Sequence, residues 1–213
     1  MKITGIEKKS GTRYTVYVDE EYFYIFDAEI LTEFHVKTGM EVDEAFLEKL
    51  KRQSDVRRAR ERAFYLLSYR DHSEKELYDK LRRNVPDEIA AQTVAKMVDL
   101  GLLDDGSYAR KLAEYYLTQK RWSFRKSLFE LKRKGIDEEA AAQALSDCGI
   151  SAKEQIRELI EQKYYRYLGD QKGSQKVLNA LARLGFSYSD SRAAMSEYLE
   201  ELELGEEDEW QYE

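Results

Sequence analysis

The chain has 213 residues, of which 42% are hydrophobic and 36% are charged, well above the roughly 25% charged residues of an average domain. Its single cysteine, Cys148, excludes a disulfide framework and a cysteine-based metal site. The chain has no apolar signal core at its start and no apolar run of about 18 residues that could span a membrane, so we expect a soluble, cytoplasmic protein.

The formal net charge of −7 is unevenly distributed along the chain. Residues 1–50 carry a net charge of −5, residues 51–134 carry +8, and residues 135–213 carry −10. Acidic residues dominate the end of the chain, and we expect residues 205–213 to form an acidic tail, because such blocks are typical of solvated ends or interaction segments.

The first 50 residues are predicted to form a β-rich segment with short helices. Three stretches alternate or run apolar and are separated by turn residues, which is typical of a three-stranded meander; they are Ile3–Lys8, Tyr14–Val18 and Tyr22–Phe26. A short helix is expected near Ala28–Phe34, and another should start near Asp43 and continue toward Arg52.

The remainder of the chain is repetitive. A shift of fifty residues places residues 55–104 on 105–154 without a gap, and pairs Leu81 with Leu131. A second shift of fifty brings Leu181 into register. We therefore predict three tandem three-helix repeats, which span residues 51–104, 105–150 and 151–204. Because each unit has only a small core, neighbouring copies should stack into an elongated, curved array.

Local signals indicate where the helices begin. Ser73 with Glu76, and Ser151 with Glu154, fit the S-x-x-E capping box. The first helix of the first repeat is expected over Asp55–Ser68. The fold class is thus mainly α, preceded by a small β segment.

Nothing in the sequence indicates catalysis. His72 stands beside Ser73, but Ser73 is better explained as a helix cap, and members of a catalytic triad meet by folding instead of by adjacency. No set of Asp, Glu and His has metal-ligand spacing, and no glycine-rich phosphate loop occurs. We predict a protein that is not an enzyme and has no cofactor, metal or catalytic residues.

The basic middle of the chain is the candidate binding surface. Lys and Arg near helix C-termini offset the helix dipole, which accounts for about half of these residues. It does not explain why basic charge concentrates between two acidic flanks, and we predict a stripe that contacts phosphates or an acidic protein surface. Its candidate residues are Arg57, Arg58, Lys120, Arg121, Trp122, Arg125, Lys126, Lys132 and Arg133.

Aromatic and apolar residues are interleaved with this basic charge. Trp122 precedes a predicted helix, either as an exposed contact residue or as a hydrophobic staple before the Ser123 cap. The helix over 123–134 should turn Phe124, Leu128 and Leu131 toward the core, since Arg125, Phe129, Lys132 and Arg133 share its other side. The tyrosines that match between copies are expected in core or junction packing; they are Tyr65, Tyr115 and Tyr165.

Several segments resemble the RecX family. The stretch Leu67-Ser-Tyr-Arg-Asp-His-Ser-Glu-Lys-Glu-Leu77 with Leu81 is similar to the first-repeat signature, and Gly101-Leu-Leu-Asp-Asp105, Tyr108-Ala-Arg110 and Lys126–Ile136 are similar to the middle block. The resemblance covers about residues 55–150, and it departs from the family at Trp122, where a small residue or glycine is expected.

The resemblance implies three tandem three-helix repeats and a regulatory role. It implies binding to the RecA recombinase as a filament on single-stranded DNA, and restraint of the ATPase, strand-exchange and co-protease activities of RecA. Two alternatives remain open: a direct nucleic-acid binder that uses the basic 51–134 surface, with the helix at 123–134 as reader, and an inert helical scaffold. The expected partners are RecA and single-stranded DNA. We expect the protein to be a monomer and not to associate with a membrane.

Overall fold

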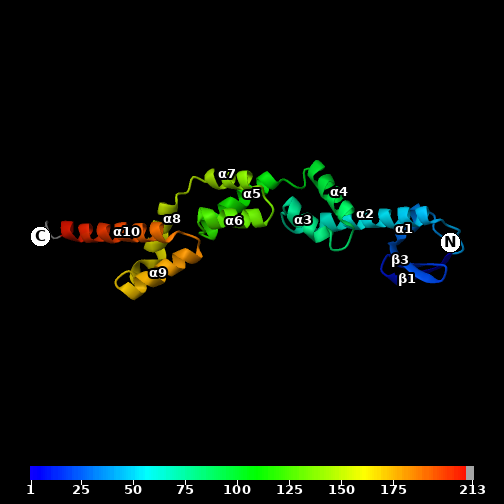
Figure 1. Ribbon diagram of the computed structural model, residues 1–213, viewed down its shortest axis with the longest axis horizontal. Helices are drawn as coiled ribbons and strands as arrows, with labels where there is room; N and C mark the ends of the chain where they lie inside the picture. Colours follow the sequence, from blue (N-terminus) through cyan, green and yellow to red (C-terminus); the bar gives the residue numbers. More distant parts are fainter. Residues whose placement is uncertain (210–213) are drawn as a thin grey trace. The chain divides into compact units, whose positions relative to one another are not determined.

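The computed structural model describes residues 1–209, with side chains up to Leu202. It forms two compact units, Met1–Leu103 and a second unit that begins at Asp104. Figure 1 follows the elements from the N-terminal strands to the last helix. Residues 210–213, the end of the predicted acidic tail, lie outside the described residues.

The N-terminal strands form the predicted meander. The sheet is antiparallel with the order β1-β2-β3; the strands are β1 Ile3–Ser10, β2 Arg13–Val18 and β3 Glu21–Asp27. Asp19 and Glu20 both have positive φ, as a tight two-residue hairpin turn requires. One face of the sheet buries Ile3, Val16 and Phe26 with the short helix α1 (Ala28–Glu33).

A single long helix, α2 (Glu44–Tyr69), joins this segment to the first repeat. The two helices predicted near Asp43–Arg52 and Asp55–Ser68 are therefore one, and the predicted boundary between residues 50 and 51 falls inside it. In Figure 1 the sheet lies beside the first part of α2, and α3 and α4 lie beside its end. Leu47 and Leu50 pack on the sheet, whereas Ala59 and Ala63 belong to the repeat core.

Three groups of helices follow the predicted plan, each around its own apolar cluster. The first repeat adds α3 (Glu74–Leu81) and α4 (Asp87–Asp99) to the end of α2. The second contains α5 (Asp105–Glu114) with a π-helical turn at Tyr115–Gln119, then α6 (Phe124–Arg133) and α7 (Glu138–Ser146). The third contains α8 (Ala152–Leu159), a π-helical turn at Ile160–Tyr164, a short 3-10 turn at Tyr165–Tyr167, α9 (Gln171–Arg183) and α10 (Tyr188–Glu209).

The third repeat departs from the gapless shift of fifty. Its first N-cap, Ser151, lies 47 residues after the corresponding Asp104, whereas Arg183 lies 50 residues after Arg133 at the end of the second helix. The three-residue difference is taken up by α9, which has 13 residues where α6 has 10. The match of Tyr165 with Tyr115 is therefore wrong.

The expected burial of the matching tyrosines is also wrong. The exposed fractions of Tyr65, Tyr115 and Tyr165 are 62%, 42% and 44%. A basic side chain lies over each ring: Arg62 over Tyr65, Lys120 over Tyr115 and Arg166 over Tyr165. Phe124, expected in the core, is 40% exposed.

Candidate interaction surfaces

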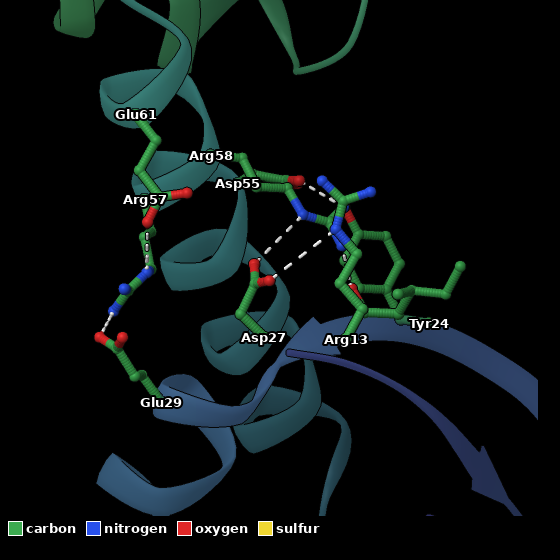
Figure 2. Close-up of polar contacts among 9 residues, drawn as sticks. Arg13, Tyr24, Asp27, Glu29, Asp55, Arg57, Arg58 and Glu61 are labelled. Carbon is green, nitrogen blue, oxygen red and sulfur yellow. Dashed lines mark hydrogen bonds and ion pairs between the residues drawn. The ribbon is translucent and has the colours of Figure 1, made fainter. Parts of the chain in front are cut away.

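The basic candidates on α2 lie where this helix meets the sheet. Figure 2 shows Arg57 and Arg58 on different sides of the helix. Arg57 forms ion pairs with Glu29 of α1 and, at 2.9 Å, with Glu61 one turn further along α2. The pairing raises the pKa of the Arg57 guanidinium through its hydrogen bond to Glu29.

Arg58 is built into the contact between α2 and β3. Its guanidinium donates to the backbone oxygen of Ile25 and to the Tyr24 hydroxyl at 3.1 Å, and its Nε lies 3.9 Å from Asp27. Figure 2 shows dashed lines from the Asp27 carboxylate to both Arg58 and Arg13. The Tyr24 hydroxyl donates in turn to Asp55, and burial together with this bond raises the pKa of Tyr24 to about 12. Arg58 therefore has a structural role in holding the helix against the sheet.

The turn before α6 also makes contacts inside the protein. Arg121 adopts a positive φ of 53° and pairs with Glu158 of α8. Trp122 is half-buried, with its ring centroid 4.8 Å from that of Tyr116, and the Lys126 ammonium lies 4.6 Å from the centre of the indole. The structure therefore packs Trp122 against the second repeat core.

The same turn docks on the third repeat. The Ser123 amide donates to the carbonyl of Leu184 at 2.9 Å, and the Lys126 ammonium donates to the carbonyl of Arg183 at 2.6 Å. Buried Gln155 of α8 donates to the carbonyl of Leu117 at 2.9 Å. Sequence reasoning missed Gln155 and Glu158 as the partners of this turn, because no periodic signal distinguishes them from other polar helix residues.

The outer face of α6 carries the remaining candidates. Arg125 is exposed and, within the described residues, has no ion-pair partner. Phe129, one turn further on, is 64% exposed. Lys132 pairs with Glu138 at 2.5 Å and Arg133 with Glu130 at 2.6 Å, and both basic residues are exposed. Lys120 is also exposed, and its ammonium lies 5.4 Å from the centre of the Tyr115 ring.

The structure thus separates the nine candidates into three groups. Arg57 and Arg58 join α2 to α1 and to β3 in the first unit. Arg121, Trp122 and Lys126 belong to the turn where the second and third repeats meet. The other four candidates are exposed: Arg125, Lys132 and Arg133 lie on α6 with Phe129, and Lys120 ends the preceding π-helical turn. We call this set of five residues the α6 basic face.

The residue pair considered for catalysis is structural. Ser73 and Glu76 form a complete capping box at the start of α3. His72 is buried, its Nδ1 lies 2.9 Å from the Arg70 carbonyl oxygen, and burial lowers the pKa of its imidazole. In the described part of the chain no group of three or more His, Cys, Asp or Glu could hold a metal ion, and no helix is long and apolar enough to cross a membrane.

Three segments of the chain match models of known protein domains. Residues 1–43 match the regulatory protein RecX N-terminal domain, residues 59–97 match the first RecX three-helix domain, and residues 104–145 match the second. Regulatory protein RecX of Bacillus velezensis is 32% identical over 200 residues, which cover 90% of this chain and 74% of that protein. The chain belongs to the RecX family.

Other RecX proteins support the same assignment. Regulatory protein RecX of Bacillus subtilis is 31% identical over 200 residues, with 90% of this chain and 74% of that protein covered. A crystal structure of regulatory protein RecX superposes with a TM-score of 0.60 at 25% identity, and covers 92% of this chain and 98% of its own. The crystal structure of RecX from Lactobacillus salivarius superposes with a TM-score of 0.57 at 26% identity, and covers 67% and 96%. The expected fold class, a mainly helical repeat protein with a small N-terminal sheet, is confirmed.

Proposed function

We propose that this RecX protein regulates the RecA recombinase of the bacterial cytoplasm by binding its filament on single-stranded DNA. The binding restrains the ATPase, strand-exchange and co-protease activities of RecA, and the protein contributes no catalytic step of its own. It acts as a monomer. Membership of a family whose relatives are named regulatory proteins supports a binding role.

The α6 basic face is the observation that carries the proposal. Arg125, Lys132 and Arg133 lie three or four residues from the exposed Phe129 along the helix, and a few arginines with an aromatic residue are the combination found at protein contact surfaces. The pair Lys132–Glu138 does not prevent this use, because both side chains are exposed and exposed ion pairs are worth only about 0–1 kcal/mol. The Arg133 side chain is also exposed, although its partner Glu130 is largely buried.

A titration of RecA ATPase on single-stranded DNA tests the proposal. The wild-type chain should inhibit the ATPase at amounts below those of RecA, since blocking a filament affects many protomers. The variant Arg125→Glu with Arg133→Gln should need about tenfold more protein, equivalent to roughly 1.4 kcal/mol of weakened binding. Arg125 lies in the first turn of α6, where a glutamate favours the helix dipole, so the fold is preserved.

The matched control is Lys172→Glu with Lys176→Gln. Both lysines are exposed on α9 of the same unit, and the change in net charge is identical. If both variants lose inhibition equally, the net charge of the protein determines the inhibition and the α6 basic face is not the contact surface. If the wild-type chain leaves the ATPase unchanged at stoichiometric amounts, RecA regulation itself is refuted.

A further inference from the structure

A pocket of about 630 Å³ lies within the first unit, whereas the α6 basic face belongs to the second. It is bounded by the turn of the β1–β2 hairpin, by α2 and by the loop that follows α3. Lys9, Arg13, Arg58 and Arg62 bring four cations to its wall, and Tyr65 adds an aromatic ring. Sequence reasoning did not connect these residues, because the hairpin and α2 are far apart along the chain.

The positive charge of this pocket is poorly compensated. Lys9 and Arg62 have no ion-pair partner among residues 1–202, for which side chains are described. Arg13 and Arg58 share one carboxylate, Asp27, at 3.9 Å each, and the buried Nε of Arg58 lacks a hydrogen-bond acceptor. The only carboxylate on the wall, Glu61, already pairs with Arg57. A partly enclosed site with this excess of cations favours an anion.

The aromatic residue in the pocket wall indicates which kind of anion fits. Tyr65 is 62% exposed, and the guanidinium of Arg62 lies 5.2 Å from the centre of its ring. Arginine guanidinium groups bind phosphate through two hydrogen bonds, and an arginine plane beside a tyrosine ring is a surface on which nucleobases stack. A carboxylate or inorganic phosphate would use the cations and leave the exposed ring unused, whereas a nucleotide unit uses both.

We propose that this pocket binds single-stranded nucleic acid, with a phosphate between Lys9, Arg13 and Arg62 and a base against Tyr65. The site differs in position and residues from the α6 basic face, so the chain carries one surface for a protein and another for the nucleic acid strand. Because such binding requires no recombinase, it goes beyond the proposed function and is tested without RecA.

Fluorescence anisotropy of a labelled oligo-dT of about 16 nucleotides, a length that spans a typical single-strand site, measures the binding. The wild-type chain should bind with an affinity that falls as salt rises. Arg62→Glu should weaken binding by about tenfold or more, and the slope of log affinity against log salt should fall by about 0.7 for each phosphate group that the variant no longer binds. Tyr65→Ala should weaken binding about tenfold with little change in the salt slope.

Two neighbours on α2 supply matched controls. Arg60 is exposed and lies outside the pocket, so Arg60→Glu makes the same charge change on another face of the helix. Tyr69 is 84% exposed, so Tyr69→Ala removes an aromatic ring outside the pocket wall. Both controls should bind within about twofold of the wild type, with the fold of all variants checked by circular dichroism.

Three results would overturn the proposal. The first is absence of oligo-dT binding by the wild-type chain at low salt. The second is equal weakening in Arg60→Glu and Arg62→Glu, which would assign the binding to net charge. The third is displacement of oligo-dT by a poly-glutamate peptide at equal charge concentration, with the same dependence on Arg62, which would assign the pocket to an acidic protein segment. Weakening confined to Arg62→Glu and Tyr65→Ala supports it.

Discussion

Replacement of Gly185 by alanine should loosen the contact between the second and third repeats. Gly185 has a φ of +95°, and a Cβ atom there would lie 2.5 Å from the Ser123 hydroxyl and 2.6 Å from the Lys126 Cβ. The left-handed conformation costs an alanine about 1–2 kcal/mol. Forcing the docked turn away costs about 1–3 kcal/mol more, as in overpacked cores, because the buried Ser123 hydroxyl is held as the N-cap of α6.

Gly149 separates these two contributions. It also has a positive φ, of 64°, but an added Cβ atom would meet nothing within 4 Å. Gly149→Ala should therefore lower the free energy of unfolding by about 1–2 kcal/mol, whereas Gly185→Ala should lower it by about 2–5 kcal/mol. The difference between the two variants measures the docking of the repeats alone.

Urea denaturation followed by tryptophan fluorescence gives this difference. Trp122 adjoins the docked turn, and a Trp210→Phe background makes it the single tryptophan of the chain. In Gly185→Ala the emission of Trp122 should also change in the native state, since Ser123 next to it must move. Equal losses of stability in the two glycine variants, with unchanged native emission, would refute the reasoning that this contact is tightly packed.

Three further predictions follow from buried polar groups. Gln155→Leu removes the donor to the Leu117 carbonyl and should cost about 1–3 kcal/mol in the same urea assay, and an unchanged midpoint would show that the carbonyl finds another donor. Burial lowers the pKa of His72 below its ordinary value of 6.5, so the neutral form is stabilised in the fold and stability should fall as pH drops from 6.5 through the folded-state pKa; His72→Gln should flatten this part of the profile of melting temperature against pH. Burial and the bond to Asp55 raise the pKa of Tyr24 from 10.0 to about 12, so its stabilising effect is present below pH 10 and lost as pH rises toward 12. A tyrosinate absorbance titration should contain a late phase that Tyr24→Phe abolishes, and a phase that survives this substitution belongs to another tyrosine.

Local sequence signals predicted helix starts well. Both S-x-x-E motifs form complete capping boxes, at Ser73 and at Ser151. A capping box depends on side-chain and backbone atoms within four residues, so its outcome is insensitive to the rest of the fold. The helix start predicted at Asp55 was wrong because of long-range contacts. Asp55 was expected to open a helix, but it is buried inside α2, where it accepts the Tyr24 hydrogen bond from the sheet.

The repeat pattern predicted equivalent positions but not their surroundings. Tyr65 and Tyr115 do occupy matching places, yet both are exposed, because the recurrence of a residue between copies does not reveal which face of the helix packs. The sequence match also did not reveal that α9 is three residues longer than α6. Leu131 and Leu181 keep the spacing of fifty and dominate a gapless match, whereas the first helix of the third repeat is shifted.

The candidate site shows why linear charge is a weak guide to a binding surface. The net charge of +8 over residues 51–134 counts every arginine equally. In the folded chain Arg58 is fixed by a backbone carbonyl, a hydroxyl and a shared carboxylate, and its removal would leave buried groups without partners. Arg58 is therefore less available to a ligand than the exposed Arg125.

How readily a basic side chain binds a ligand depends instead on the internal contacts that it would lose on binding. Lys132 would exchange an exposed ion pair worth about 0–1 kcal/mol for an intermolecular one, so the exchange is nearly neutral before a partner's further contacts are added. Arg133 would give up more, because its partner Glu130 is largely buried. Arg125 and Arg62 give up no ion pair with a described residue. Arg62 lies over the exposed Tyr65 ring, and Arg125 is four residues from the exposed Phe129 on the same helix. The binding energy of this protein should therefore concentrate at these two places, and reversal of charge at either one should weaken binding more than the removal of any paired cation.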